Sequence, residues 1–265
     1  MNIVVCIKQV PNTNEVKLDP VTGTLIRDGV PSIMNPDDKA GLEAALRLKD
    51  SMGAHVTVVS MGPMQADAVL REAMAMGADD AYLISDRAFG GADTLATSTT
   101  IAAAIKKIPY DLIITGRQAI DGDTAQVGPQ IAEHLNIPNV SYAEDIQVEG
   151  DTVTVKRQYE DRYHTVKVKM PCLITALSEL NQPRYMTPGG IFDAYREKTV
   201  TVWTVNDIEV DMDKIGLKGS PTRVFQSFPK SLKAAGTVVT LDGEEAADYM
   251  PVSYTHLPLP TILRV

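Results

Sequence analysis

Short apolar runs alternate with longer stretches of helical period through the first 140 residues of the chain. The runs are rich in Val, Ile and Leu and lack a regular alternation with polar residues, as expected of parallel strands that are covered on both faces. They fall at residues 3–7, 55–59, 80–84 and 111–115. This pattern predicts an α/β fold in which helices connect the strands of a doubly wound, mostly parallel sheet.

Helical segments are expected at 36–52, 64–76 and 94–107. The first has the clearest start. Asn35 can serve as its N-cap, Pro36 occupies the first helical position, and Asp37 and Asp38 face the positive end of the helix dipole.

The pattern changes beyond residue 138, where three β-type segments follow one another around a turn at Gly150. These segments cover 142–148, 152–158 and 164–169. They predict an antiparallel β excursion over 142–169. The apolar run 172–177 could then return to the main sheet.

Pro and Gly become frequent from Asn181 onward, so an extended C-terminal arm with little core of its own is expected over 181–250. The main α/β domain would then cover 1–180, excursion included. A helix that begins near Leu241 is expected to stop at Pro251. The last residues, 252–265, are either a natural polyproline-like tail or a cloning, assembly or reading-frame artefact, and we favour the artefact.

Charge and cysteine content narrow the classes of function. Lys and Arg number 25 and Asp and Glu 34, a net charge of −9, which disfavours nucleic acid as a partner. Cys6 and Cys172 are too few for a disulfide framework and are not spaced as metal ligands, which fits a reducing cytoplasm. The chain opens without a basic leader, and no apolar run approaches the roughly 20 residues that span a bilayer. Neither export nor membrane insertion is therefore expected.

Common catalytic signatures are absent from the sequence. It has no GxSxG elbow, no P-loop ending in GK[ST], no GxGxxG, no HExxH and no EF-hand loop. Its four histidines lie far apart in the chain. No catalytic residue and no metal site are therefore predicted.

The most informative segment is GRQAIDGDTAQVGP, residues 116–129, which directly follows the fourth predicted strand. Open α/β sheets bind ligands at the carboxyl ends of their strands. The ring of Pro129 would clash with the carbonyl of Ala125, so the next helix starts no earlier than about one turn before Pro129. Amides between Gly122 and Gly128 are then free to bind an anion such as a pyrophosphate. The alternative is a solvated Asp-Gly turn with an ordinary aspartate N-cap.

Taken together, several separated motifs resemble the β subunit of electron-transfer flavoprotein. They span roughly residues 1–250 and read VCIKQVP, SIMNPDD, SMGP, AMGAD, TGRQAIDGDTAQVGPQIA and LNQPRYMTPGGIFDA. The family's signature near 155–176 is matched less closely, because Arg162 and His164 stand where small, acidic or amide residues are usual.

The resemblance implies a Rossmann-like, adenine-nucleotide-binding domain that pairs with a larger α subunit. By position, it implies nucleotide contacts from Cys6, Lys8, Asn35, Met61, Asp121, Gly122, Asp123, Thr124, Ala125, Gln126, Val127 and Gly128.

The family also implies two alternatives for the nucleotide. Ordinary carriers hold AMP structurally, whereas the electron-bifurcating branch holds a second FAD that takes hydride from NADH. That branch sends one electron to the flavin of the α subunit and the other to ferredoxin or flavodoxin. The loop DGDTAQVGP, with its small Gly122, Thr124 and Ala125, is similar to the bifurcating branch. We therefore expect FAD, with AMP as the alternative.

The segment 181–195 resembles the loop with which the family docks onto acyl-CoA dehydrogenases. Pro188 stands where many members have an anchoring leucine. The apolar side chains expected at the docking surface are those of Tyr185, Ile191, Phe192 and Tyr195. The alternative is a plain Pro/Gly-rich connector.

Overall fold

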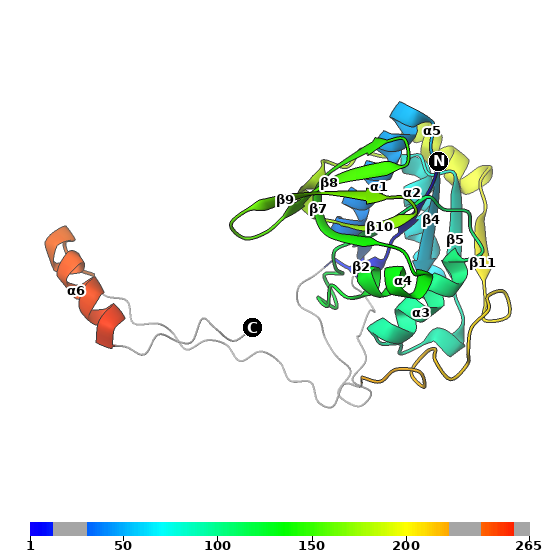
Figure 1. The fold of residues 1–265 in the computed structure, drawn as a ribbon. Helices are drawn as coiled ribbons and strands as arrows, with labels where there is room; N and C mark the ends of the chain where they lie inside the picture. The colour runs from blue at the N-terminus through cyan, green and yellow to red at the C-terminus, as the bar shows by residue number, and fades with distance from the viewer. Residues whose placement is uncertain (13–30, 223–239, 257–265) are drawn as a thin grey trace. The chain divides into compact units, whose positions relative to one another are not determined.

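A nine-stranded sheet forms the centre of the fold in a computed structural model, which describes residues 1–12, 31–222 and 240–256, with side chains to 249 (Figure 1). Across the sheet, the strands are β11 (Val200–Trp203), β5 (Asp80–Ile84), β4 (His55–Met61), β1 (Asn2–Cys6), β6 (Leu112–Gly116), β10 (Cys172–Ala176), β7 (Asn139–Glu149), β8 (Thr152–Gln158) and β9 (Tyr163–Lys169). The chain divides into two compact units, Met1–Gln226 and Ser227–Val265. The sheet belongs to the first.

Neighbouring strands from β11 to β7 are parallel, and β8 and β9 complete the sheet antiparallel to their neighbours. The predicted mixed α/β architecture with a mostly parallel sheet is therefore confirmed. The strand β10 lies between β6 and β7, whereas the sequence indicated only that the apolar run after residue 171 could return to the main sheet. A separate antiparallel pair is formed by β2 (Gln9–Pro11) and β3 (Ser32–Met34).

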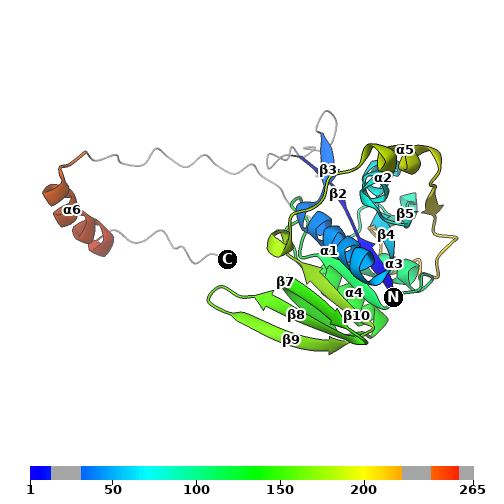
Figure 2. The same cartoon turned by 90° about the horizontal axis from the view of Figure 1, so that it is seen from above.

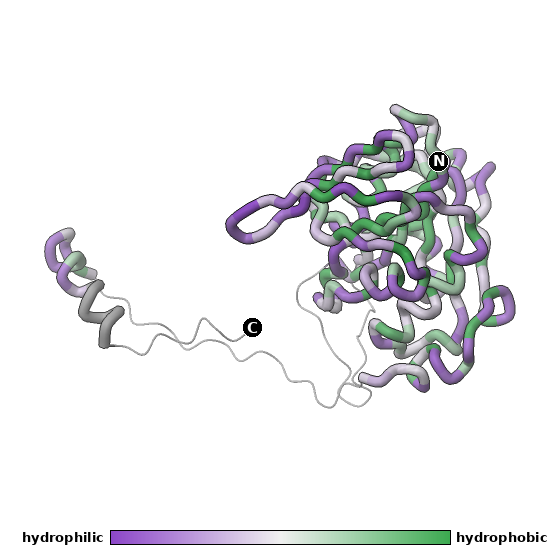
Figure 3. Tube along the Cα trace, in the orientation of Figure 1, coloured by the Kyte–Doolittle hydropathy of each residue, from purple (hydrophilic) through white to green (hydrophobic). Residues whose placement is uncertain are grey.

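Helices lie on both faces of the sheet (Figures 1 and 2). Helices α1 (Pro36–Met52) and α2 (Asp67–Met76) pack on the face that carries Ile3 and Val5 of β1. Helices α3 (Thr94–Ile105) and α4 (Val127–Leu135) pack on the opposite face, which carries Val4. Successive side chains of a strand point to opposite faces, which explains why the central strands are apolar throughout. Figure 3 shows these hydrophobic stretches in the middle of the first unit.

The expected helices and strands agree with the structure to within a few residues. Helix α1 has the bounds that the sequence predicted. The second helix opens with a 3₁₀ turn over Met64–Ala66, another 3₁₀ turn covers Arg87–Phe89, and a third covers Ser178–Leu180. Helix α3 ends two residues before its expected end, and β7 starts three residues early.

The expectation of an extended arm from residue 181 is wrong as far as residue 222. Helix α5 (Pro188–Arg196) packs against α2, and β11 extends the sheet beside β5. A Cβ at Gly190 would lie 2.3 Å from the carbonyl oxygen of Ala75, so glycine is what lets α5 approach α2 this closely. The sequence signal for α5 was hidden because two glycines follow its first residue.

The second unit contains helix α6 (Gly243–His256). The prediction that Pro251 ends this helix is wrong, because Pro251 lies inside it. A proline removes one backbone hydrogen bond and disfavours a helix, but the flanking turns can continue on both sides of it. Residues 257–265 of the doubtful tail lie outside the described residues.

Candidate functional site

The chain reverses direction across the sheet between β1 and β6. From β1 it proceeds to β4 and β5 on one side, and then crosses to β6 on the other. Connections that leave two neighbouring parallel strands in opposite directions open a crevice at their carboxyl ends, which is where open α/β sheets bind ligands. Cys6, Lys8 and Asn35 lie at this edge, together with the loop that follows β6.

The carboxylate of Asp38, in the first turn of α1, bridges this crevice. Its Oδ2 accepts a hydrogen bond of 2.8 Å from the backbone N–H of Lys8, and its Oδ1 accepts one of 3.0 Å from the N–H of Gly116. A Cβ at Gly116 would lie 2.2 Å from Asp38 Oδ1, so only glycine leaves room for this contact. Burial is the main cause that raises the pKa of Asp38, to about 7. The sequence predicted for Asp38 only a favourable interaction with the dipole of α1.

Asp37, the preceding residue, fixes the neighbouring strand β10. Its Oδ1 accepts a hydrogen bond of 3.1 Å from the N–H of Ser178, and its Oδ2 lies 3.5 Å from Nε of Arg117. Burial raises the pKa of Asp37, and the charge of Arg117 opposes that rise. The first turn of α1 therefore ties together the ends of β1, β6 and β10.

Asn35 precedes α1, but the expectation that its side chain caps this helix is wrong. Its Nδ2 donates to the carbonyl oxygen of Gln118 at 2.8 Å, and its Oδ1 accepts from the N–H of Ile120 at 3.1 Å. Asn35 is fully buried. The side chain therefore shapes the loop after β6, a long-range role that a local capping pattern does not reveal.

Lys8 reaches the same loop through its side chain. Its Nζ lies 2.6 Å from Oδ1 and 2.9 Å from Oδ2 of Asp121. Lys8 also borders a small cavity of about 70 Å³, which is lined by Gln9, Met61, Gly62, Pro63 and Ala66 as well. The predicted contacts Lys8 and Met61 therefore share one hollow at the edge of the sheet.

The loop 121–128 keeps most of its backbone N–H groups unpaired. Those of Gly122 and Asp123 donate to the carbonyl oxygen of Ala119, which corrects the expectation that all the amides from Gly122 onward are free. Those of the five residues Thr124 to Gly128 make no hydrogen bond to any other residue that the structure describes. Helix α4 begins within one turn of Pro129, as expected, and its N-cap residue Gln126 provides no capping side chain.

Backbone conformation gathers these amides. Asp123 and Ala125 both have a φ of 52°, in the left-handed region that residues other than glycine rarely adopt. Ala125 is followed by Gln126 in a right-handed conformation, with φ −108° and ψ −31°. Alternation of the two hands turns successive N–H groups towards one side and makes an anion-binding concavity. The alternative in which Asp123 is an N-cap is wrong, because the N-cap of α4 is Gln126, and the carboxylate of Asp123 accepts instead from Nε2 of Gln118.

Gly128 brings the start of α4 against the sheet. A Cβ there would lie 2.5 Å from Oγ1 of Thr115 and 2.9 Å from Cγ2 of Thr175. By contrast, a Cβ at Gly122 would meet nothing within 4 Å. The close approach at Gly128 places the positive end of the α4 dipole beside the ends of β6 and β10.

Cys6 is present at this edge without reactive chemistry. Burial, followed by the charge of Asp38, raises the pKa of the Cys6 thiol to about 12, so it stays protonated near neutral pH. The described residues contain no cluster of three or more His, Cys, Asp or Glu suited to a metal ion. None of their helices has both the length and the apolarity needed to span a bilayer.

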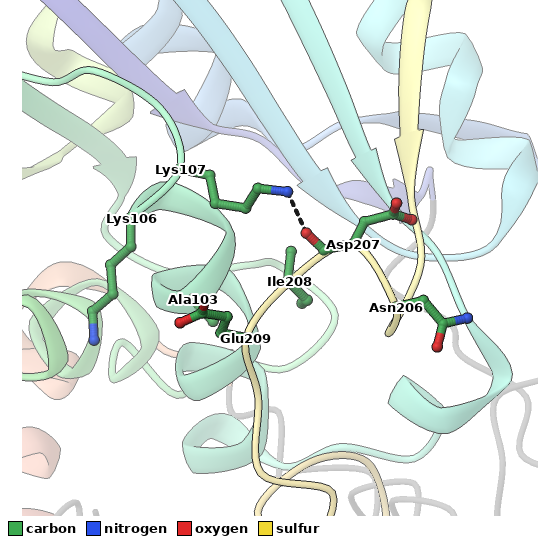
Figure 4. Close-up of a pocket in the computed structure, with 7 residues that line it drawn as sticks. All are labelled: Ala103, Lys106, Lys107, Asn206, Asp207, Ile208 and Glu209. Carbon is green, nitrogen blue, oxygen red and sulfur yellow. Dashed lines mark hydrogen bonds between the residues drawn. The ribbon is translucent and has the colours of Figure 1, made fainter.

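A larger cavity, of about 460 Å³, lies elsewhere, between the end of α3 and the segment after β11 (Figure 4). Its lining residues are Ala103, Lys106, Lys107, Asn206, Asp207, Ile208 and Glu209. The ammonium of Lys107 donates to the carbonyl oxygen of Asp207 and lies 4.4 Å from the centre of the Trp203 ring. Its charge is therefore already engaged, and no residue implied in nucleotide binding lines this cavity.

The four residues expected at a docking surface are all exposed. Tyr185 is 92% exposed and precedes α5, which carries Ile191, Phe192 and Tyr195. Three of them thus lie on a short helix, not on the loop that the sequence suggested. The side chain of Thr187 caps this helix by accepting from the N–H of Gly190 at 2.9 Å.

Arg184 anchors the chain just before this surface. Its guanidinium donates to Glu43 at 2.8 Å and to Asp50 at 2.7 Å, both on α1. Burial alone would raise the pKa of Glu43, but the hydrogen bonds from Arg184 and Arg47 lower it overall. The ion pair therefore fixes the route by which the chain reaches Tyr185.

Comparisons with known proteins assign this chain to a family. A family model described as the electron transfer flavoprotein domain matches residues 22–208. The chain is 62% identical over 250 residues to an electron transfer flavoprotein subunit beta of Clostridium acetobutylicum, which covers 94% of this chain and 96% of that protein. It is 57% identical over 246 residues to the subunit beta of Thermoanaerobacterium thermosaccharolyticum, with 93% and 95% covered.

The chain belongs to the family of electron transfer flavoprotein beta subunits. A further relative, the caffeyl-CoA reductase-Etf complex subunit CarD of Acetobacterium woodii, is 58% identical over 242 residues, which cover 91% of this chain and 92% of that protein. The family resemblance read from the separated motifs is thereby confirmed.

Proposed function

We propose that this chain is the nucleotide-binding β subunit of a heterodimer with an electron transfer flavoprotein α subunit, and that the loop 121–128 binds the diphosphate of FAD. The observation that carries this proposal is the run of unpaired backbone N–H groups from Thr124 to Gly128 at the N-terminus of α4. Unpaired amides at a helix N-terminus favour phosphate, and the left-handed residues Asp123 and Ala125 aim them towards one side.

The residues at the crevice fit such a group. Lys8 neutralises Asp121, so this carboxylate does not oppose a phosphate with an unpaired charge. Asn35 holds the preceding part of the loop, and Met61 supplies an apolar wall beside Lys8. Bound FAD would supply the redox chemistry, by taking hydride from NADH and passing electrons to the α-subunit flavin and to ferredoxin or flavodoxin.

The alternative is AMP held as a permanent part of the fold, since the same amides would bind one phosphate. The nucleotide content of the complex decides between the two. The complex of this chain with its α subunit is purified and denatured with acid, and the released FAD and AMP are counted. We expect one flavin from each subunit and no AMP. One flavin together with one AMP per complex would support the alternative.

Reduction by NADH tests the electron route independently. Under anaerobic conditions, the complex is mixed with NADH and flavin absorption is followed. FAD in this chain predicts direct bleaching of flavin absorption by NADH. If this chain holds AMP, it contains no flavin that can receive hydride, and direct bleaching by NADH is not observed. A variant with Gly128→Ala, whose methyl group would press against Thr115 and Thr175 and displace the start of α4, serves as the control.

The exposed apolar surface of Tyr185, Ile191, Phe192 and Tyr195 is the proposed docking site for an acyl-CoA dehydrogenase. Aromatic side chains dominate many protein interfaces. The names of two relatives support a partner of this class: CarD, described above, and an acryloyl-CoA reductase electron transfer subunit gamma of Anaerotignum propionicum, 49% identical over 258 residues, which cover 94% of this chain and 96% of that protein. The cytoplasm is the compartment proposed for this electron transfer.

A further inference from the structure

We propose that Asp38 is a positioning residue for the nucleotide site, and that its ionised carboxylate holds the carboxyl ends of β1 and β6 at the spacing needed to bind a diphosphate. This inference rests on the proposed nucleotide-binding function and adds to it a pH dependence. Asp38 itself contacts the two strand ends and needs no contact with the ligand.

Asp38 lies just beyond the hydrogen bonds that join β1 to β6. Paired residues of β1 and β6 end with Cys6 and Thr115. Beyond that pair, the two oxygens of Asp38 receive the N–H groups of Lys8 and Gly116. The carboxylate therefore continues the connection between two strands after their own hydrogen bonds have stopped.

Both N–H groups belong to residues that lead into the proposed ligand-binding surface. The ammonium of Lys8 is paired with Asp121 in the loop 121–128. Gly116 is the first residue of the segment that ends in the five unpaired amides. A shift of either strand end would therefore move part of the ligand-binding surface.

The protonation state of Asp38 decides how strongly it accepts these two hydrogen bonds. The two N–H groups that bind Asp38 are both donors, and the ionised form offers each of them a charged acceptor oxygen. A proton on one oxygen makes that oxygen a weaker acceptor, and it therefore weakens the hydrogen bond to one of the two strand ends. The backbone at Gly116 lies so close that a Cβ there would come within 2.2 Å of Oδ1, so the carboxyl group of Asp38 has little space to turn.

The charged and titratable groups near Asp38 are already paired or neutral. On its own helix, Asp37 faces Arg117 and the N–H of Ser178. From β1, the Cys6 thiol is neutral and the Lys8 ammonium is paired with Asp121.

No cation contacts Asp38 among the described residues, and its burial raises its pKa to about 7. Its protonation therefore falls within the range of an ordinary binding experiment.

The test measures binding of FAD to the full chain at several values of pH from 5.5 to 8.5 by equilibrium dialysis. Circular dichroism at each pH verifies the fold. If only the ionised form binds well, the affinity at pH 6 should be about tenfold weaker than at pH 8, because the competent fraction falls by that factor. Asp38→Asn should bind weakly at every pH and lack this dependence.

Asp37→Asn is the matched control, since it removes a charge from the same helix turn and leaves the hydrogen bonds of Asp38 to Lys8 and Gly116 in place. It should keep the loss of affinity towards acid pH, with a midpoint at lower pH, because the charge of Asp37 is one of the causes that raise the pKa of Asp38. An affinity that stays constant or rises towards acid pH, with the fold intact, would overturn the proposal, because relief of charge repulsion would then dominate. So would an Asp38→Asn variant that binds as tightly as wild type at pH 8.

Two further outcomes separate this inference from the proposed function. If wild type binds neither FAD nor AMP at any pH, the nucleotide-binding function itself is contradicted. If it binds AMP alone, the same profile is measured with AMP, and the profile of Asp38→Asn, which lacks the carboxylate, corrects for the titration of the AMP phosphate. If Asp38→Asn fails to fold, the wild-type profile with FAD decides, since a constant affinity between pH 6 and pH 8 overturns the proposal.

Discussion

The ammonium of Lys8 lies 2.6 Å from Oδ1 of Asp121 and joins the end of β1 to the loop that follows β6. The two partners differ in environment, because the Lys8 side chain is 43% exposed whereas that of Asp121 is 6% exposed. The buried charge of Asp121 therefore needs the ammonium of Lys8 as its partner, whereas water can solvate the charge of Lys8. This pair ties the loop to the end of the strand.

Replacement of Lys8 by Met should weaken nucleotide binding and destabilise the loop, because it leaves Asp121 without its cation beside the phosphate site. The effect on global stability should be small, about 1 kcal/mol, since Lys8 is partly exposed. Adding Asp121→Asn to this variant should restore part of the affinity, which a double-mutant cycle in nucleotide dialysis would measure. Lys39→Met, which breaks a pair with Glu72, is the control. Equal losses in both lysine variants would contradict the prediction.

Replacement of Gly128 by Ala should lower both stability and nucleotide content. The new methyl group would press against Thr115 and Thr175, and such overpacking costs roughly 1–3 kcal/mol. Gly122→Ala is the matched control, because its methyl group would meet nothing within 4 Å. Urea unfolding and the nucleotide released by acid would be measured for both. Loss of nucleotide in Gly122→Ala alone would be inconsistent with this account of the loop.

The pH dependence of stability should carry the signature of Asp38. Burial raises its pKa from 3.8 in the ordinary state to about 7, so in this range the folded chain keeps a proton that the unfolded chain releases. Its contribution to the unfolding free energy therefore falls as pH rises from about 4 to 7 and levels off above that. Asp38→Asn lacks this loss. The midpoint of urea unfolding of the variant, relative to wild type, should rise across that window, and a constant difference would refute the assignment.

Replacement of Phe192 by Ala should slow electron transfer to an acyl-CoA dehydrogenase without changing nucleotide content. Phe192 is 57% exposed on α5, so little folding stability depends on it. Met212→Ala removes an apolar side chain that is 54% exposed outside the docking surface, and it should leave the rate unchanged. Rates would be followed with the purified complex at several dehydrogenase concentrations. If both variants transfer electrons at the wild-type rate, the docking surface lies elsewhere.

Local signals explain why much of the fold could be predicted from the sequence. Pro36 and the two following aspartates mark the start of α1, and the apolar runs mark the strands. The loop after β6 was found because Pro129 restricts where a helix can begin. These features act within a few residues of chain, so their physical cause is visible in the sequence.

Long-range contacts explain the rest. Asn35 resembles a helix cap, but its partners are Gln118 and Ile120, more than eighty residues away. Asp38 has an ordinary position in a helix, yet its role depends on two strand ends that only the folded sheet brings together. Helix α5 likewise depends on a neighbour, since Gly190 disfavours a helix in isolation and favours one that packs on α2.

The place of β10 between β6 and β7 constrains how this chain is completed during synthesis. Until the ribosome has released Cys172–Ala176, one side of β6 stays open and β7 has no parallel neighbour to join. Ser178, whose N–H donates a hydrogen bond to Asp37, is synthesised later still. A nascent chain that already contains the loop 121–128 therefore cannot complete the sheet edge that supports this loop until some fifty further residues have been made.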